Sequence, residues 1–312
     1  MPSGPGPGAR SVYAVAITPF TPDGELDVPA ARAHLRRLAD AGVGAYVGGS
    51  GSGEGYTLAP DEVTELLAIA VDEVGDRIPV RAMGREPRTA QEMVDAVADA
   101  AAAGVEATQI YSLDVGHGHR PRRDAVETYL RTVLDSTDLP CVLSSHQSVG
   151  YRIDVDLYAA LLERYPHVAG INCSHADQHY LRQLIAASRG RATVHVGGEA
   201  AAMTALAFGA EGFLSSAANL APRLARSVID RFVAGDLAGW TDAFSTMHAL
   251  GGLLYAHGGI LATKAVLGRF DLPGGAPRLP HLPLPDDEVD RVEAGVRALG
   301  IPEIEQWADV AG

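Results

Sequence analysis

The side chain in this chain with the most specific reactivity is the amine of Lys264, the single lysine among 312 residues. A primary amine can form an imine with a carbonyl substrate, and in a protein that amine belongs to lysine or to the N-terminus of the chain. In this chain only Lys264 and the N-terminal amine could therefore form an imine. Histidine offers a different route, because its ordinary pKa suits proton transfer near neutral pH.

Polar side chains gather where short apolar runs end. They are Ser144, Ser145, His146, Asn172, Cys173, Ser174 and His175 after the runs 141–144 and 168–172, His195 and Glu199 around the end of 193–196, and Asp114, His117 and His119 after 107–111. If these runs are parallel barrel strands, their C-terminal ends carry the catalytic residues. His195 lies within a run, which favours a core position for it.

The elements that must position these side chains follow from an alternation of apolar runs and helical patterns between residues 11 and 234. The predicted strands are 12–18, 45–47, 78–82, 107–111, 141–144, 168–172, 193–196 and 212–214. Asp27 is a candidate cap for the first helix. Eight strand–helix units in roughly 220 residues fit a closed (β/α)8 TIM barrel better than an open sheet. No Gly-x-Gly-x-x-Gly motif follows the first strand, which weakens a dinucleotide-binding fold.

We expect three parts along the chain. Residues 1–10 are rich in proline and glycine and are predicted to be disordered, with no apolar segment of the kind a secretory signal needs. Residues 11–234 form the barrel. Residues 235–312 form a C-terminal helical region, with a Pro/Gly-rich connection over 273–285.

Composition narrows the classes of partner. The formal net charge is −14, which argues against nucleic acid and anionic membranes. No apolar run approaches the roughly 20 residues that span a bilayer. The two cysteines, Cys141 and Cys173, lie in apolar runs and suit a reduced, cytoplasmic setting. We expect a small-molecule substrate and no cofactor.

Several short motifs follow one another along the chain. They are Ile17-Thr18-Pro19-Phe20, Asp23-Gly24-Glu25-Leu26-Asp27, Ser50-Gly51-Ser52-Gly53-Glu54, Gly209-Ala210-Glu211-Gly212-Phe213-Leu214-Ser215, Ala218-Asn219-Leu220-Ala221-Pro222, Thr263-Lys264-Ala265 and Arg278-Leu279-Pro280. Over residues 12–299 this order resembles the dihydrodipicolinate synthase / N-acetylneuraminate lyase family. The resemblance implies a (β/α)8 barrel with C-terminal helices, usually a homotetramer. It also implies aldol, retro-aldol or dehydration chemistry on pyruvate or related 2-oxo acids.

One motif matches the turn with which that family holds a substrate carboxylate. The family's turn reads Gly-Thr-Thr-Gly-Glu, and here it reads Ser50 to Glu54. Gly-rich turns bind anions through backbone N–H groups, so Gly51 and Ser52 are candidate substrate-binding residues. Gly51 lacks the hydroxyl that serves the family's proton relay. A turn that only joins a strand to a helix is the alternative.

The catalytic positions of the family are filled differently. Its imine-forming lysine follows Gly-Ile at the end of strand six, where this chain has Asn172, whose amide is not a nucleophile. Its two relay tyrosines fall on the stretches 144–147 and 113–115, which contain no tyrosine, and its carboxylate-binding arginine aligns near Val149. Lys264 belongs to the C-terminal helices, where the family often also carries lysine, so we do not expect it to be catalytic.

These observations predict a lyase or aldolase-type enzyme that acts on a small anionic oxo acid or related carbonyl compound without a Schiff base. His146 and His175 would move protons, and Asn172 with Ser144 would orient the carbonyl group or an enolate. The predicted substrate-binding residues are Gly51, Ser52, Ser145 and Glu199. A homo-oligomer, tetramer or dimer, is expected.

Other interpretations remain open at this point. The chain is alternatively a non-catalytic, ligand-binding homologue, since barrels host many functions. His117 and His119, joined by His146, His175 or Glu199, would suit a metal-dependent aldolase, in which the ion polarises the carbonyl group. A nucleophilic pair of Cys173 and His175 is a further possibility. A conventional pyruvate-dependent synthase is disfavoured by the missing lysine.

Overall fold

The structure is a computed structural model that describes residues 10–84 and 86–307. Apart from Arg10, the N-terminal segment predicted to be disordered lies outside the described residues.

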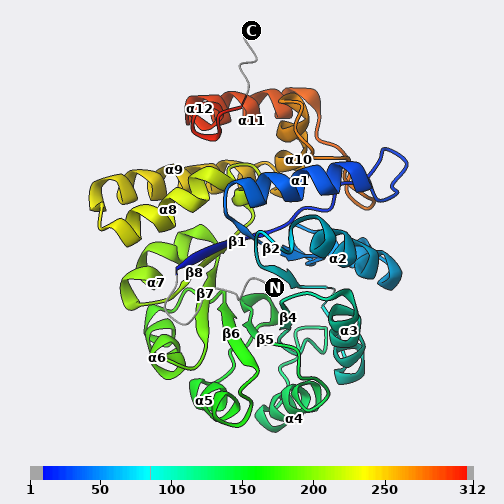
Figure 1. The fold of residues 1–312 in the computed structure, drawn as a ribbon, viewed down its shortest axis with the longest axis vertical. Helices are drawn as coiled ribbons and strands as arrows, with labels where there is room; N and C mark the ends of the chain where they lie inside the picture. Colours follow the sequence, from blue (N-terminus) through cyan, green and yellow to red (C-terminus); the bar gives the residue numbers. More distant parts are fainter. Residues whose placement is uncertain (1–9, 85, 308–312) are drawn as a thin grey trace.

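Eight parallel strands close into a barrel in which each strand pairs with the next and β8 pairs with β1 (Figure 1). The strands are β1 (Ser11–Val15), β2 (Gly44–Val47), β3 (Val80–Ala82), β4 (Ala107–Ile110), β5 (Cys141–Ser145), β6 (Val168–Cys173), β7 (Thr193–Gly197) and β8 (Gly212–Ser215). The predicted TIM barrel is therefore confirmed.

A helix follows each strand and covers the outside of the barrel (Figure 1). These helices are α1 (Val28–Asp40), α2 (Pro60–Val74), α3 (Ala90–Ala103), α4 (Arg123–Leu134), α5 (Val155–Arg164), α6 (Gln178–Ser188), α7 (Ala202–Phe208) and α8 (Pro222–Ala234). Local chemistry sets their starts: the Asp27 carboxylate accepts a hydrogen bond from Ala30 N at 3.0 Å, as predicted, and Thr89 caps α3 in the same way.

Strand residues alternate between the two faces of the barrel wall. Outward side chains join the helices in the main apolar core. Inward side chains form a second, separate cluster that fills the barrel, made of Tyr13, Tyr46, Met83, Tyr111 and Leu214. Beside it lies Arg81 of β3, which is 5% exposed and holds its guanidinium 4.5 Å from the centre of the Tyr13 ring.

Short 3-10 turns follow four of the strands at their C-terminal ends. They are η1 (Gly55–Thr57) after β2, η2 (Gln147–Val149) after β5, η3 (Glu199–Ala201) after β7 and η4 (Ala217–Asn219) after β8. These turns shape the end of the barrel at which enzymes of this architecture carry their active sites.

Beyond α8 the chain adds α9 (Leu237–Ala256), α10 (Ile260–Arg269), α11 (Asp286–Ala298) and α12 (Ile301–Glu305). They form a layer beside α8 and α1, outside the ring of strands (Figure 1). In the described residues no single helix is long and apolar enough to cross a membrane; α9 and α10 meet that test only as a pair, bent by 104°.

Candidate functional site

Asn172 stands near the C-terminal end of β6 and points into the barrel, as its bond to another inward residue shows. Its Nδ2 donates a hydrogen bond to Gln109 Oε1 of β4 at 2.7 Å. The residue is 7% exposed, and its Oδ1 has no hydrogen-bond partner within the described residues. A carboxamide pair therefore links β6 and β4 inside the barrel, toward the C-terminal ends of these strands.

Gln109 was not predicted as a site residue. It lies inside the apolar run of β4 and is 4% exposed, two positions before Tyr111, which belongs to the inward-facing cluster. The signal that would have found it is its spacing of two from Tyr111, because positions i and i+2 of a strand share a face.

Ser144 and Ser145 end β5 and are both buried. Ser144 pairs in register with Asn172 on the neighbouring strand, and its carbonyl oxygen accepts a hydrogen bond from Ser112 Oγ at 2.7 Å. Ser145 faces the other way, since its hydroxyl lies 3.2 Å from the hydroxyl of Tyr180 on α6. The structure thus brings Ser144 to Asn172 and separates Ser145 from both.

His146 directly follows β5 and His175 lies two residues after β6, so both belong to the rim of the barrel mouth. Burial lowers the pKa of both imidazoles, and for His175 the nearby positive charge of Arg152 adds to the effect and brings the pKa to about 4. His175 packs edge-on against Tyr180, and its Nε2 has no partner within the described residues. A neutral imidazole near pH 7 can accept a proton.

We expect an NMR titration of the histidine ring protons to show His175 with an inflection near pH 4 rather than near 6.5. The folded state holds this imidazole neutral, whereas the unfolded chain protonates it more readily. The contribution of His175 to the free energy of unfolding is therefore lost as the pH falls below the pKa of the unfolded state. A His175→Gln variant assigns the resonance. An inflection at 6 or above would show that the ring is solvated and would contradict its burial.

Arg152 completes this rim, although no motif or spacing in the sequence points to it. Its guanidinium is ion-paired with Asp177 and lies 4.9 Å from the centre of the Tyr180 ring. Asp177 also caps α6 by accepting bonds from His179 N and Tyr180 N. Asp177, itself held at the start of α6, therefore fixes the position of the Arg152 guanidinium next to His175.

The turn that follows β2 carries the predicted anion-binding residues. Ser52 is buried, and its hydroxyl contacts the hydroxyl of Ser216, which directly follows β8. Gly51 is exposed, with open space where a side chain would stand. Gly55 has no such freedom, because a Cβ there would lie 2.2 Å from the carbonyl oxygen of Gly48. The turn is packed tightly on one side and open on the other.

Lys264 lies in α10 and not in the barrel. Its ammonium group is ion-paired with Glu54 of the same turn and donates a hydrogen bond to the carbonyl oxygen of Ala276 at 2.9 Å. The two charged side chains are 1% and 0% exposed. None of these partners belongs to a strand, and α10 itself lies outside the ring of strands (Figure 1).

Glu54 takes the left-handed backbone conformation, with φ of 51°, which is uncommon for a residue other than glycine. Its second carboxylate oxygen accepts a hydrogen bond from Arg278 N at 3.1 Å, and the Arg278 side chain in turn forms a two-point ion pair with Glu62. The C-terminal region thereby fixes the backbone of the turn that carries Ser52.

One predicted substrate-binding residue, Glu199, lies elsewhere, and His195 was predicted to be a core residue. Glu199 accepts a hydrogen bond from Ser215 Oγ at 2.9 Å and fills the space next to Gly251 of α9, which takes it toward the outer helices. His195 is 2% exposed, and its Nε2 lies 2.8 Å from Ser11 Oγ at the start of β1. Its assignment to the core is confirmed.

The alternative chemistries find little support in side-chain placement. His117 and His119 lie on an exposed loop, and no group of three potential metal ligands occurs among the described residues. Burial raises the pKa of the Cys173 thiol, which keeps it protonated and a poor nucleophile at neutral pH.

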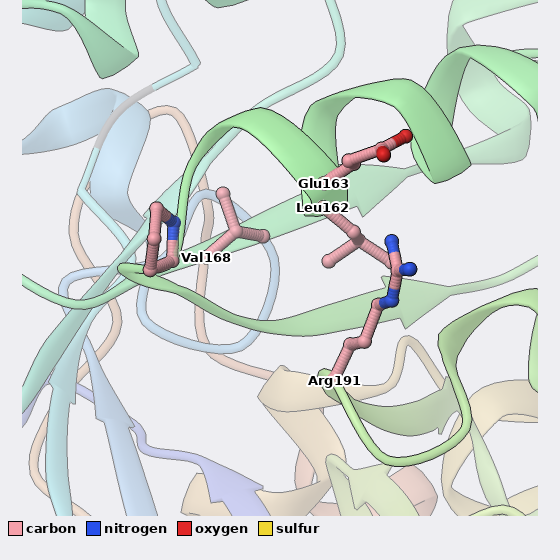
Figure 2. A pocket seen from close by; sticks show the side chains of 5 residues that line it. Leu162, Glu163, Val168 and Arg191 are labelled. Carbon is pink, nitrogen blue, oxygen red and sulfur yellow. The ribbon is translucent and has the colours of Figure 1, made fainter.

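A surface hollow of about 310 Å³ lies at the opposite end of the barrel (Figure 2). Leu162 and Glu163 of α5, Val168 at the start of β6 and Arg191 before β7 line it together with Pro166. These positions lie at the N-terminal ends of strands, where conservation in such barrels serves stability rather than catalysis.

Comparison with known proteins agrees with this architecture. The model of the "Dihydrodipicolinate synthetase family" matches residues 9–299. A 4-hydroxy-tetrahydrodipicolinate synthase from Mycolicibacterium paratuberculosis is 30% identical over 93% of this chain and 95% of its own length. One from Mycolicibacterium gilvum is 33% identical over 91% and 92%, respectively. Dihydrodipicolinate synthase DapA-2 from Bacillus anthracis superposes with a TM-score of 0.84 at 23% identity, covering 93% of this chain and 98% of its own. The chain therefore belongs to the dihydrodipicolinate synthetase family.

Proposed function

We propose that this protein is a lyase or aldolase-type enzyme of its family that acts on a small anionic oxo acid or related carbonyl compound without forming a Schiff base. The single observation that carries the proposal is the placement of Asn172. A carboxamide points into the barrel from the end of β6, while the only lysine is engaged in a buried ion pair outside the ring of strands. An amide does not form an imine, so the carbonyl group has to be activated by hydrogen bonds or by proton transfer.

The side chains at the mouth suit such a mechanism. Asn172 and Ser144 lie next to each other on β6 and β5 and are placed to orient the reacting group. His175, neutral near pH 7, and His146 are the bases at the rim. Ser52 and the turn that contains Gly51 would hold the anionic group, and Arg152 adds positive charge to the same rim. Ser145 and Glu199 are retained as substrate-binding candidates, although their hydroxyl and carboxylate face the helices.

A specific observation favours a second candidate, a non-catalytic homologue that binds a ligand. The barrel interior is filled by the large side chains of Tyr46, Met83, Tyr111 and Leu214. Met83 leaves no room for a side chain at position 49, since a Cβ on Gly49 would lie 2.5 Å from its Sδ. Packing of this kind restricts how deeply a substrate enters.

The remaining assignments accompany this proposal. The barrel of residues 11–234 would be the catalytic domain, and residues 235–312 would support the turn after β2 through Lys264 and Arg278. We also propose a cytoplasmic protein, in keeping with its free cysteines, and a homo-oligomer, dimer or tetramer, as the family resemblance implies.

Treatment with borohydride in the presence of pyruvate should leave the protein unmodified, because no amine side chain faces the barrel. Mass spectrometry of the intact protein and of its peptides measures the result. A reduced pyruvate adduct on Lys264 would overturn the proposed mechanism. In parallel, calorimetric titration with 2-oxo acids and turnover assays with the same compounds separate the two candidates: binding with turnover supports the enzyme, and binding without turnover supports the ligand-binding homologue.

A further inference from the structure

The start of α6 holds the segment that follows η2 at three points. The Asp177 carboxylate is ion-paired with Arg152, and the centre of the Tyr180 ring lies 4.9 Å from the same guanidinium. The Tyr180 hydroxyl donates a hydrogen bond to the carbonyl oxygen of Ile153 at 2.7 Å, one residue after Arg152. Because Asp177 also accepts a hydrogen bond from Tyr180 N at 3.0 Å, all three contacts come from one capped helix start.

The same tyrosine contacts His175. The two rings meet in a T-shaped arrangement, with 5.6 Å between their centroids and 83° between their planes. Tyr180 is 6% exposed and His175 is 9% exposed, so little of the imidazole reaches water. A single ring therefore lies against both the candidate base and the neighbouring cation, Arg152.

The protonation of His175 depends on what surrounds it. Burial is the largest influence and lowers the pKa of the imidazole. Three ionisable side chains also act on it: Arg152 and His146 lower the pKa, whereas Asp177 raises it. The guanidinium that lies over the Tyr180 ring therefore opposes the Asp177 carboxylate, which alone would favour the protonated ring.

We propose that Tyr180 is a positioning residue of the candidate site, whose ring holds the His175 imidazole and the Arg152 guanidinium in fixed places relative to each other. The inference rests on the proposed function, which gives His175 the role of a base. Its consequence is a division of labour within one side chain. The ring acts on His175, and the hydroxyl stabilises the fold by bonding the backbone carbonyl of Ile153.

NMR titration of the His175 ring protons in the full-length protein tests this division. In Tyr180→Leu the inflection should move upward from about pH 4 by about one unit or more, because the imidazole gains water and the guanidinium loses its support. Tyr180→Phe keeps the ring and should keep the inflection within about 0.3 unit. Loss of its hydroxyl should still lower the midpoint of urea unfolding.

A matched control separates positioning from general damage to the core. Tyr129 of α4 is also buried, and its hydroxyl donates to the carbonyl oxygen of Tyr111 at 3.0 Å. Among the described residues its ring is paired with neither His175 nor Arg152. Tyr129→Leu should therefore lower the urea midpoint and leave the His175 inflection unchanged.

Arg152→Gln tests the second contact of the ring, and the half-exposed position of Arg152 makes this a mild substitution for folding. Removal of the cation should raise the His175 inflection by about 0.5 unit. In a Tyr180→Leu background the same change should have less than half that effect, because the guanidinium is no longer held in place. Arg182→Gln, which removes an exposed cation two residues after Tyr180, should have no effect.

The outcomes keep the inference apart from the proposed function, since these titrations need no substrate. Equal inflections in Tyr180→Leu and Tyr180→Phe would overturn the inference and leave the proposed function standing. If Tyr180→Leu does not fold, Arg152→Gln decides alone, and an unchanged inflection there overturns the inference. The expected shifts without turnover of any 2-oxo acid would remove the proposed function and leave Tyr180 as the residue that positions His175.

Discussion

Replacement of Lys264 by methionine should lower the free energy of unfolding by about 3–5 kcal/mol, although no catalytic role is assigned to this lysine. The substitution keeps the length and apolar character of the side chain and removes only the ammonium group. It leaves the Glu54 carboxylate, 0% exposed, without its counter-charge. Loss of one partner of a buried ion pair strands the other, and that penalty exceeds the net value of the pair itself.

The measurement is equilibrium urea denaturation of Lys264→Met beside two comparison variants. Lys264→Met combined with Glu54→Gln should recover part of the loss, because an amide is far less costly to bury than an unpaired carboxylate. Arg123→Met removes a cation from an ion pair with Asp156 that is half exposed, and it should cost about 1 kcal/mol or less. A loss of under about 1 kcal/mol for Lys264→Met would show that the Glu54 carboxylate is solvated or neutral.

This pair also illustrates what the sequence did not reveal. The motifs that contain Glu54 and Lys264 both stand out in the sequence, but the two residues are 210 positions apart, and no local spacing links them. The barrel itself was predictable, because each strand–helix unit has local sequence signals, namely the periodicity of its apolar residues and its capping residues. Asp27 at the start of α1 is an example. An ion pair between residues far apart in the chain has no comparable local sequence pattern.

The sequence predicts the residues of the barrel interior less completely than those of its rim. Polar residues just after strand ends, such as Asn172 and His175, stand out against the apolar runs that precede them. Gln109 and Arg81 lie within such runs, and both faces of a parallel barrel strand are buried, so polarity does not alternate there to show which side chains point inward. Arg152 was missed for another reason, since its role depends on Asp177 across two loops.

Introduction of an amine by Asn172→Lys should convert a protein that gives no borohydride adduct with pyruvate into one that is labelled at that position. The side chain at this position points inward near the end of β6, where such barrels carry their catalytic groups. Burial disfavours the charged ammonium form and so lowers the pKa of an amine placed there, which raises the fraction able to attack a carbonyl group.

Labelling of Asn172→Lys should increase with pH as that amine loses its proton, and peptide mass spectrometry should locate the adduct at position 172. Asn172→Met is the matched control, since it has a flexible chain of comparable shape and no amine, and it should remain unlabelled with Lys264 still present. If Asn172→Lys folds, as judged by circular dichroism, and still gives no adduct, a carbonyl compound does not reach the end of β6. The filled interior around Met83 and Tyr111 would then be the physical reason, and the ligand-binding homologue would be favoured over the enzyme.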